Sequence, residues 1–199
     1  MKRVMCLILS SAFILAVPAS AEDIHEVFKK VEEYAQQKNF PKALEELQWA
    51  QKELEKMHQA RLAELLPGSI DGFTGEEPQF QSAMGFSSIE RQYVKGDDGI
   101  RLSIAGAAGT DGMGGLAGLA KMGMMMGGTQ PGKEQFRIDG RTATLDTSGG
   151  SPELTVLLES GGILQLQADG ESVNAASLKK FAQALKLGDL DSYLKGGKS

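Results

Sequence analysis

The side chains best able to do chemistry in this sequence are the methionines of GMGGLAGLAKMGMMMGG, residues 112–128. Five of these seventeen residues are methionine, seven are glycine, and Lys121 carries the one charge. Thioether sulfur is a soft ligand that selects copper(I), so a copper(I) site is one interpretation. Against it, Met124, Met125 and Met126 are consecutive, so on a helix or strand they point in different directions rather than converging. Neither of the two histidines lies nearby in the sequence.

An apolar contact surface is the interpretation of this segment on which the expected function rests. A glycine inside a helix costs about 1 kcal/mol relative to alanine, so seven glycines disfavour an autonomous helix. The segment would then be ordered by burial, by a partner or by lipid, and methionine suits surfaces that repack on different targets. The alternatives are a crossover segment that covers one face of a sheet and a weak membrane contact. The predicted contact residues are Met113, Leu116, Leu119, Met122, Met124, Met125 and Met126.

No other group of residues forms a recognisable catalytic or metal-binding motif. His25 and His58 fall on helical stretches, where they read as solvated or half-buried residues. The adjacent acids of GEEP (75–78) and GDDG (96–99) lack the alternating acids and closing glutamate of a calcium loop. The glycine-rich stretch 109–115 is not followed by the Gly-Lys-Ser/Thr of a phosphate-binding loop. We therefore expect no catalytic residues, no bound metal, no cofactor and no enzyme activity.

The first 21 residues, MKRVMCLILSSAFILAVPASA, are typical of a secretory signal peptide. Lys2 and Arg3 precede an apolar run, Val4–Val17, that is short for a membrane span. Ala19-Ser20-Ala21 is a cleavage site of the A-x-A type, so we expect cleavage after Ala21. The one cysteine, Cys6, lies inside this signal, which leaves a mature chain without disulfides. A bacterial periplasm fits this pattern best.

The charge of the chain limits its partners. The formal net charge is −5, and it becomes more negative when the basic signal residues are removed. An acidic surface disfavours nucleic acid and anionic lipid as partners. An envelope protein or an apolar ligand remains as the expected partner.

Residues 22–66 are predicted to form a helical hairpin. Apolar residues recur at spacings of three and four in both halves, and Lys38–Pro41 is the expected turn. Asp23 is positioned to cap the first helix. We expect Ala43 and Ala50 at the close contact between the helices, with Tyr34 and Phe40 packed around them. The predicted stripes are Ile24, Val27, Phe28, Val31 and Tyr34, followed by Ala43, Leu44, Leu47, Ala50, Leu54, Met57, Leu62 and Leu65.

This hairpin resembles a lone tetratricopeptide unit, on the stretch YAQQKNFPKALEELQWA. Tyr34, Phe40, Ala43 and Ala50 sit at the spacing of that repeat's large and small packing positions. The sequence departs from the pattern because Glu55 stands where the closing proline would be. No second copy follows, although a solenoid needs about three. The resemblance implies a packing arrangement and a tendency to bind partners, with no specific ligand.

Residues 67–195 are predicted to form an antiparallel sheet with a C-terminal helix packed on it. Alternating apolar residues flank turn sequences at 95–99, at Asp139-Gly140 and at Gly161-Gly162, which gives three hairpin-like units and five or six strands. The stretch 174–194 is predicted to be one helix capped by Asn174. Helices that flank a run of strands favour an α+β fold: an N-terminal α-helical hairpin, then an antiparallel sheet, then the helix.

This second part looks like the PsbP-like fold or an open half-barrel of the LolA type. The resemblance rests on LPGSIDGFTGEE, on RIDGRTATLDTSGGS followed by ELTVLLESGGILQLQADG, and on the helix SLKKFAQALKLGDL. A half-barrel implies a carrier that holds an apolar ligand between sheet and helices. We expect a non-enzymatic periplasmic binding or adaptor protein that uses segment 112–128, with the hairpin as a further contact surface. The alternatives are the apolar carrier and copper(I) handling.

Overall fold

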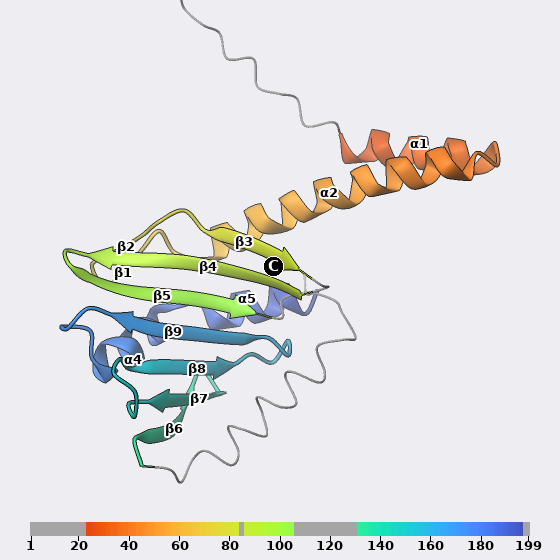
Figure 1. Ribbon diagram of the computed structural model, residues 1–199. Helices are drawn as coiled ribbons and strands as arrows, with labels where there is room; N and C mark the ends of the chain where they lie inside the picture. Colours follow the sequence, from red (N-terminus) through yellow and green to blue (C-terminus); the bar gives the residue numbers. More distant parts are fainter. Residues whose placement is uncertain (1–22, 84–85, 106–130, 197–199) are drawn as a thin grey trace, which may run out of the picture. The chain divides into compact units, whose positions relative to one another are not determined.

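The computed structural model describes residues 23–83, 86–105 and 131–196, which are the coloured parts of Figure 1. The chain divides into two compact units, residues 1–56 and 57–199, and the division falls inside a long helix. Among the described residues, no helix is both long enough and apolar enough to cross a membrane.

The first unit is a helical hairpin, as predicted. Helix α1 (Ile24–Gln36) begins at Asp23, whose carboxylate accepts a hydrogen bond from the His25 backbone N–H at 3.0 Å. The chain turns through Lys38, which has a φ of 57°, and helix α2 (Phe40–Leu65) follows. The turn is closed by the Asn39 N–H, which donates to the Tyr34 carbonyl at 2.9 Å. The last turns of α2 belong to the second unit.

The second unit is built on a nine-stranded sheet in which every described pairing is antiparallel. This confirms the α+β fold, while the expected number of five or six strands was too low. The stretch before residue 86 supplies three short strands. The strands are β1 (Ser69–Ile70), β2 (Phe73–Gly75), β3 (Gln79–Ala83), β4 (Phe86–Lys95), β5 (Asp98–Ala105), β6 (Lys133–Ile138), β7 (Arg141–Asp146), β8 (Glu153–Leu157) and β9 (Ile163–Asp169).

The strand order shows how the chain crosses this sheet. The order is β1-β2-β4-β5-β9-β8-β7-β6, and β3 pairs with β4 beside that path. All three predicted turns join neighbouring strands, as the register pairs Lys95↔Asp98, Ile138↔Arg141 and Leu157↔Ile163 show. Among the described strands, β6 is the next after β5 along the chain, but β9, β8 and β7 lie between them in the sheet.

Side chains alternate between a buried and a polar face of the sheet. In β5, Ile100, Leu102 and Ile104 are fully buried, whereas Arg101 between them is exposed. The same alternation in β9, β8 and β7 creates one continuous apolar face, because the register keeps buried residues opposite one another. A sheet with one apolar face requires a covering layer on that face.

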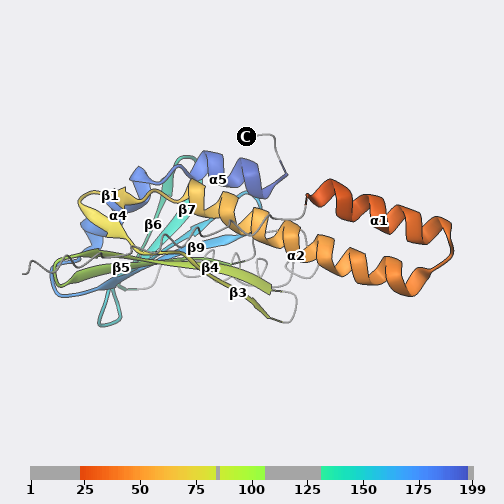
Figure 2. The same ribbon diagram turned by 90° about the horizontal axis from the view of Figure 1, so that it is seen from above.

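Two C-terminal helices, α4 (Ala175–Ala184) and α5 (Leu187–Leu194), supply that layer (Figure 2). Asn174 caps α4 as predicted, since its side chain accepts a hydrogen bond from the Ser177 N–H at 3.0 Å. The single helix predicted over 174–194 was wrong, because Leu185 is extended and separates the two helices. Leu185 and Leu187 are both buried. On a continuous helix, residues two apart lie about 200° apart, so the break allows both to face the core.

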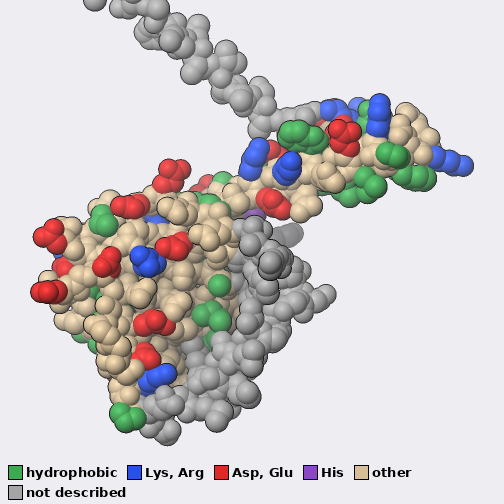
Figure 3. All heavy atoms as spheres, in the orientation of Figure 1, with side chains coloured by type: hydrophobic (Ala, Val, Ile, Leu, Met, Phe, Trp, Pro, Cys, Tyr) green, Lys and Arg blue, Asp and Glu red, His purple; other side chains and the backbone are tan. Residues whose placement is uncertain are grey.

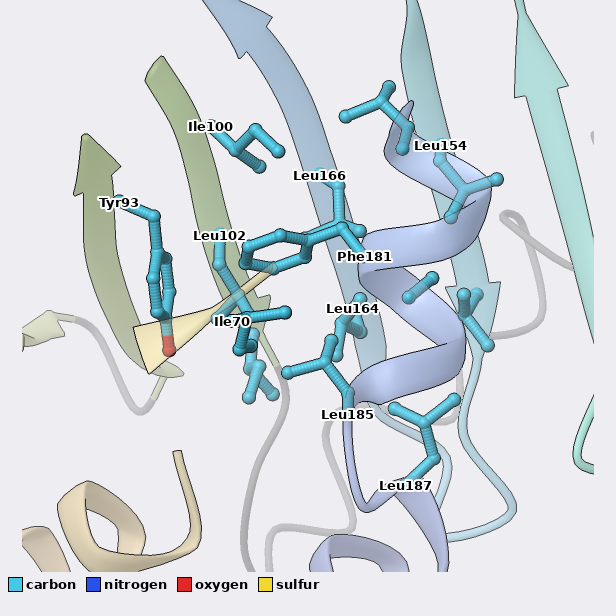
Figure 4. Close-up of a cluster of buried hydrophobic side chains, with 14 of the residues drawn as sticks. Ile70, Tyr93, Ile100, Leu102, Leu154, Leu164, Leu166, Phe181, Leu185 and Leu187 are labelled. Atoms are coloured by element: carbon cyan, nitrogen blue, oxygen red, sulfur yellow. The ribbon is translucent and has the colours of Figure 1, made fainter. Parts of the chain in front are cut away.

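The core between helices and sheet is filled by large side chains (Figure 4). Phe181 of α4 points at the sheet and packs edge to face on Tyr93 of β4, with ring centres 4.9 Å apart. Leu62, in the last turn of α2, and Leu66, directly after that helix, belong to the same cluster. The Tyr93 hydroxyl donates to the Pro67 carbonyl at 3.0 Å, which ties the chain after α2 to the sheet.

Candidate functional site

The interior of the hairpin is small. Of its apolar side chains, only Val27 of α1 and Ala43 and Ala50 of α2 are buried. The two alanines let the helices approach closely, as the sequence predicted, and Tyr34 is half-buried beside them. The expectation that Phe40 packs around this contact was wrong, because 59% of Phe40 is exposed. The two helices therefore do not satisfy each other's apolar surfaces.

Four large apolar residues of α2 form an exposed stripe. Phe40, Leu44, Leu47 and Leu54 are 59, 60, 47 and 46% exposed. Their spacing of four, three and seven residues keeps them within about 80° of one another on the helix surface. Figure 3 shows hydrophobic side chains at the surface of the hairpin. This spacing is typical of the seam of a helical bundle.

Helix α1 contributes Phe28, which is 43% exposed, to the same side of the hairpin. Phe28 is one residue after the buried Val27, just as Leu44 is one residue after the buried Ala43. Because the two helices run in opposite directions, an equal angular offset from their contact places both side chains on one side of the pair. We call this surface, made of Phe28, Phe40, Leu44, Leu47 and Leu54, the hairpin face.

In α1 and in residues 40–56 of α2, charged residues are absent from the sector that holds the contact and the hairpin face. This uncharged sector spans about 120° on each helix, and its polar member on α2 is Gln51. The Gln51 side chain donates to Glu55 at 2.9 Å, along the same helix. The uncharged residues are Ile24, Val27, Phe28, Val31, Tyr34 and Ala35 on α1 and Phe40, Ala43, Leu44, Leu47, Ala50, Gln51 and Leu54 on α2.

Trp49 provides a reference point on the opposite side of α2. It is 58% exposed, as much as the residues of the hairpin face, but it stands alone there among charged neighbours. The Lys52 ammonium lies over its ring, 5.3 Å from the ring centre. A single exposed aromatic residue is ordinary on a protein surface, whereas a contiguous apolar patch marks an interaction site.

Among the described residues of the second unit, the most deeply buried charges are Arg141 and Asp191, and they form an ion pair. The Asp191 carboxylate of α5 is paired with Arg141 of β7, and both side chains are almost fully buried. Asp191 also accepts the backbone N–H groups of Glu159 and Ser160 at 3.1 Å. Burial opposes ionisation of Asp191, but these hydrogen bonds outweigh it and lower the pKa of the carboxyl. These interactions connect α5 to the start of β7 and to the residues that follow β8.

His58 packs against Tyr193. The His58 Nδ1 atom lies 2.8 Å from the Tyr193 hydroxyl, and this contact joins the end of α2 to α5 within the second unit. Burial lowers the pKa of His58 and raises the pKa of Tyr193. His25 is exposed at the start of α1. Across residues 23–83, 86–105 and 131–196, no three His, Cys, Asp or Glu side chains are grouped in a way that could hold a metal ion.

The seven predicted contact residues of segment 112–128 lie outside the described residues, so their role stays a prediction. They are Met113, Leu116, Leu119, Met122, Met124, Met125 and Met126. The hairpin residues were recognised in the sequence as apolar stripes and were assigned mainly to the pairing of the two helices, with the hairpin as a further contact surface. The width of the uncharged sector, about 120° on each helix, was the signal in the sequence for an exposed apolar surface. Two paired helices cannot cover a sector of that width on each other.

Comparisons with protein-family models, with curated proteins and with solved structures gave no match to this chain. The resemblances to a tetratricopeptide unit and to the PsbP-like and LolA-type folds therefore remain expectations from the sequence. Any functional conclusion has to rest on the residues of the two units themselves.

Proposed function

We propose that this chain is a non-enzymatic binding or adaptor protein of the bacterial cell envelope, and that the hairpin face is its contact surface. The observation that carries the proposal is the exposure of Phe28, Phe40, Leu44, Leu47 and Leu54 on one uncharged side of the hairpin. Fully burying one such side chain contributes about 1.5–3 kcal/mol. A partner that covers the whole face therefore has a substantial free energy available for binding.

The hairpin itself also stands to gain from a partner. Helix α1 has 13 residues, and isolated helices of that length are marginal in water. Most helical stability in proteins comes from packing an apolar face, and here only three apolar side chains are buried between the helices. A partner that completes the packing would stabilise the helices as it binds.

A protein partner is favoured over a lipid surface by the charge of the hairpin. Residues 23–56 hold eight acidic and six basic side chains. Helices that lie on membranes usually have a polar face rich in Lys and Arg, which binds anionic lipid. The acidic balance of this hairpin does not supply that attraction.

The expected location is the periplasm, with a signal peptide that ends at Ala21. The test is the intact mass of the protein recovered by osmotic shock from cells that express the full chain. The expected mass is that of a chain beginning at Glu22. Recovery of the uncleaved chain in the membrane fraction would overturn the location.

Site-specific photo-crosslinking tests the contact surface. A photoreactive amino acid replaces Leu44 on the hairpin face or, as the matched control, Trp49 on the opposite side of α2. The two positions are similarly exposed, at 60 and 58%. In cells that make the protein naturally, we expect a covalent protein adduct from position 44 and none from position 49. An absence of adducts from position 44, or equal adducts from both positions, would contradict the proposal.

A further inference from the structure

We infer that the occupant of the hairpin face is a second copy of this chain, so that two hairpins pair into a four-helix bundle. This inference rests on the proposed function, because it names the partner of that same face. A two-fold symmetric contact uses one patch on both subunits, so the patch must be complementary to itself. An uncharged stripe of Phe and Leu meets that requirement, because contacts between apolar side chains are non-directional and involve no like-charge repulsion.

The available area suits such a pairing. A buried aromatic side chain covers about 150–250 Å², and an aliphatic one less. At their exposed fractions, the five residues of the hairpin face offer on the order of 400 Å² of apolar surface per copy. A standard interface buries about 800 Å² per partner, so these side chains supply about half of it. The half-buried Ile24 and Val31 and the polar edges of the stripe are positioned to supply the rest.

An antiparallel arrangement of the two α2 helices fits the stripe. If the pairing is centred on position 49, Leu44 lies against Leu54 of the second copy and Leu47 against Gln51. We adopt this antiparallel alignment for the proposed pair.

Gln51 has a clear place in this arrangement. One polar residue in an apolar seam weakens association and fixes its register. The pairing predicts that Gln51→Leu, which makes the stripe continuous, strengthens self-association by about tenfold. This gain cannot arise from damage to the fold.

Sedimentation equilibrium of the purified full chain over a wide concentration range tests the inference. We expect a reversible monomer–dimer equilibrium. Leu47→Glu should weaken it by about a hundredfold or more, because each dimer loses two apolar contacts and gains two buried charges. Trp49→Glu makes the same charge change on the opposite side of the helix and should leave the equilibrium unchanged. Glutamate is a good helix former, so neither variant should disturb α2.

A mixing experiment separates loss of contact from loss of folding. Leu47→Glu and Gln51→Lys should each be monomeric alone and should associate when mixed, because positions 47 and 51 face each other across the seam and then carry opposite charges. A wild-type chain that stays monomeric at every concentration would overturn the inference, as would equal losses in Leu47→Glu and Trp49→Glu. If the chain is monomeric but position 44 crosslinks to a different protein, the second copy is wrong and the proposed function stands. If position 44 gives no adduct either, both are wrong.

Discussion

The two units of this protein treat their apolar surfaces in opposite ways. The sheet in the second unit has an apolar face that α4, α5 and the end of α2 cover, so that residues such as Leu102, Leu164 and Phe181 are almost fully buried. The hairpin in the first unit buries three small or medium side chains and leaves its largest ones exposed. Both regions follow the same sequence rule of amphipathic periodicity. The difference shows that a periodic stripe identifies a surface to be covered, without saying whether the same unit covers it.

The largest loss of stability is expected from the centre of the second unit. Phe181→Ala removes a ring that packs on Tyr93 at 4.9 Å and on Phe73 at 6.1 Å between ring centres. A buried Phe→Ala change costs about 3–5 kcal/mol, through lost burial and the remaining cavity. Denaturant unfolding followed by circular dichroism checks the value. A loss below about 1 kcal/mol would mean that this core does not carry the stability of the unit.

The buried ion pair should come next. Asp191→Asn keeps the volume of the side chain but leaves the guanidinium of Arg141 buried without a carboxylate, which should cost about 3 kcal/mol near neutral pH. Because the pKa of Asp191 is lowered by folding, its contribution is present above its unfolded pKa of about 3.9. That contribution disappears as the pH falls through the lowered folded pKa.

Acid titration checks the sign of this effect. The free energies of unfolding of wild type and Asp191→Asn should differ most near neutral pH and converge on acidification. A difference that stays constant down to acidic pH would show that ionisation of Asp191 does not stabilise the fold.

A smaller effect is expected inside the hairpin. Ala43 is almost fully buried at the helix contact, so Ala43→Leu overpacks that contact and should destabilise the hairpin by about 1–3 kcal/mol. The hydrogen-exchange rates of the α1 amides measure this loss of stability directly. If Ala43→Leu leaves the exchange of α1 unchanged, the described pairing of the two helices is wrong. The strands of the second unit serve as the internal reference.

The smallest effect is expected at Leu44, and a buried leucine of the sheet provides the comparison. Leu164 of β9 is fully buried and Leu44 is 60% exposed. Leu164→Ala should cost about 2–5 kcal/mol, while Leu44→Ala in the dilute monomer should change the free energy of unfolding by less than about 0.5 kcal/mol. Comparable losses in the two variants would show that Leu44 is core in the monomer and would remove the basis of the proposed contact surface.

Local signals in the sequence were sufficient for most elements of the fold. The turn at Asp139-Gly140, where both residues have positive φ, and the cap at Asn174 are where the sequence predicted them. The alternation of apolar residues on both sides of the turn at 95–99 correctly indicated two strands, which are β4 and β5. These features depend on neighbours within a few residues, which a single sequence records directly.

The features that depend on distant contacts could not be predicted in the same way. The short strands β1 and β2 exist because they pair with each other and with β4, and two or three residues carry no periodicity. The break at Leu185 is set by the packing of Leu185 and Leu187 on the sheet. The exposure of Phe40 and Leu44 depends on which surface is opposite them. The apolar stripe was visible in the sequence, but the element that covers it was not.

Hydrogen exchange of the purified protein at several concentrations tests the central claim most directly. The account predicts that amides of β5 and β9 are strongly protected at every concentration, because the second unit completes its own core. Amides of α1 and of residues 40–56 should be weakly protected in dilute protein and gain protection as the concentration rises, in wild type and Trp49→Glu but not in Leu47→Glu. Strong protection of the hairpin in the dilute monomer, unchanged by concentration, would contradict the claim that a partner stabilises the hairpin by covering its exposed face.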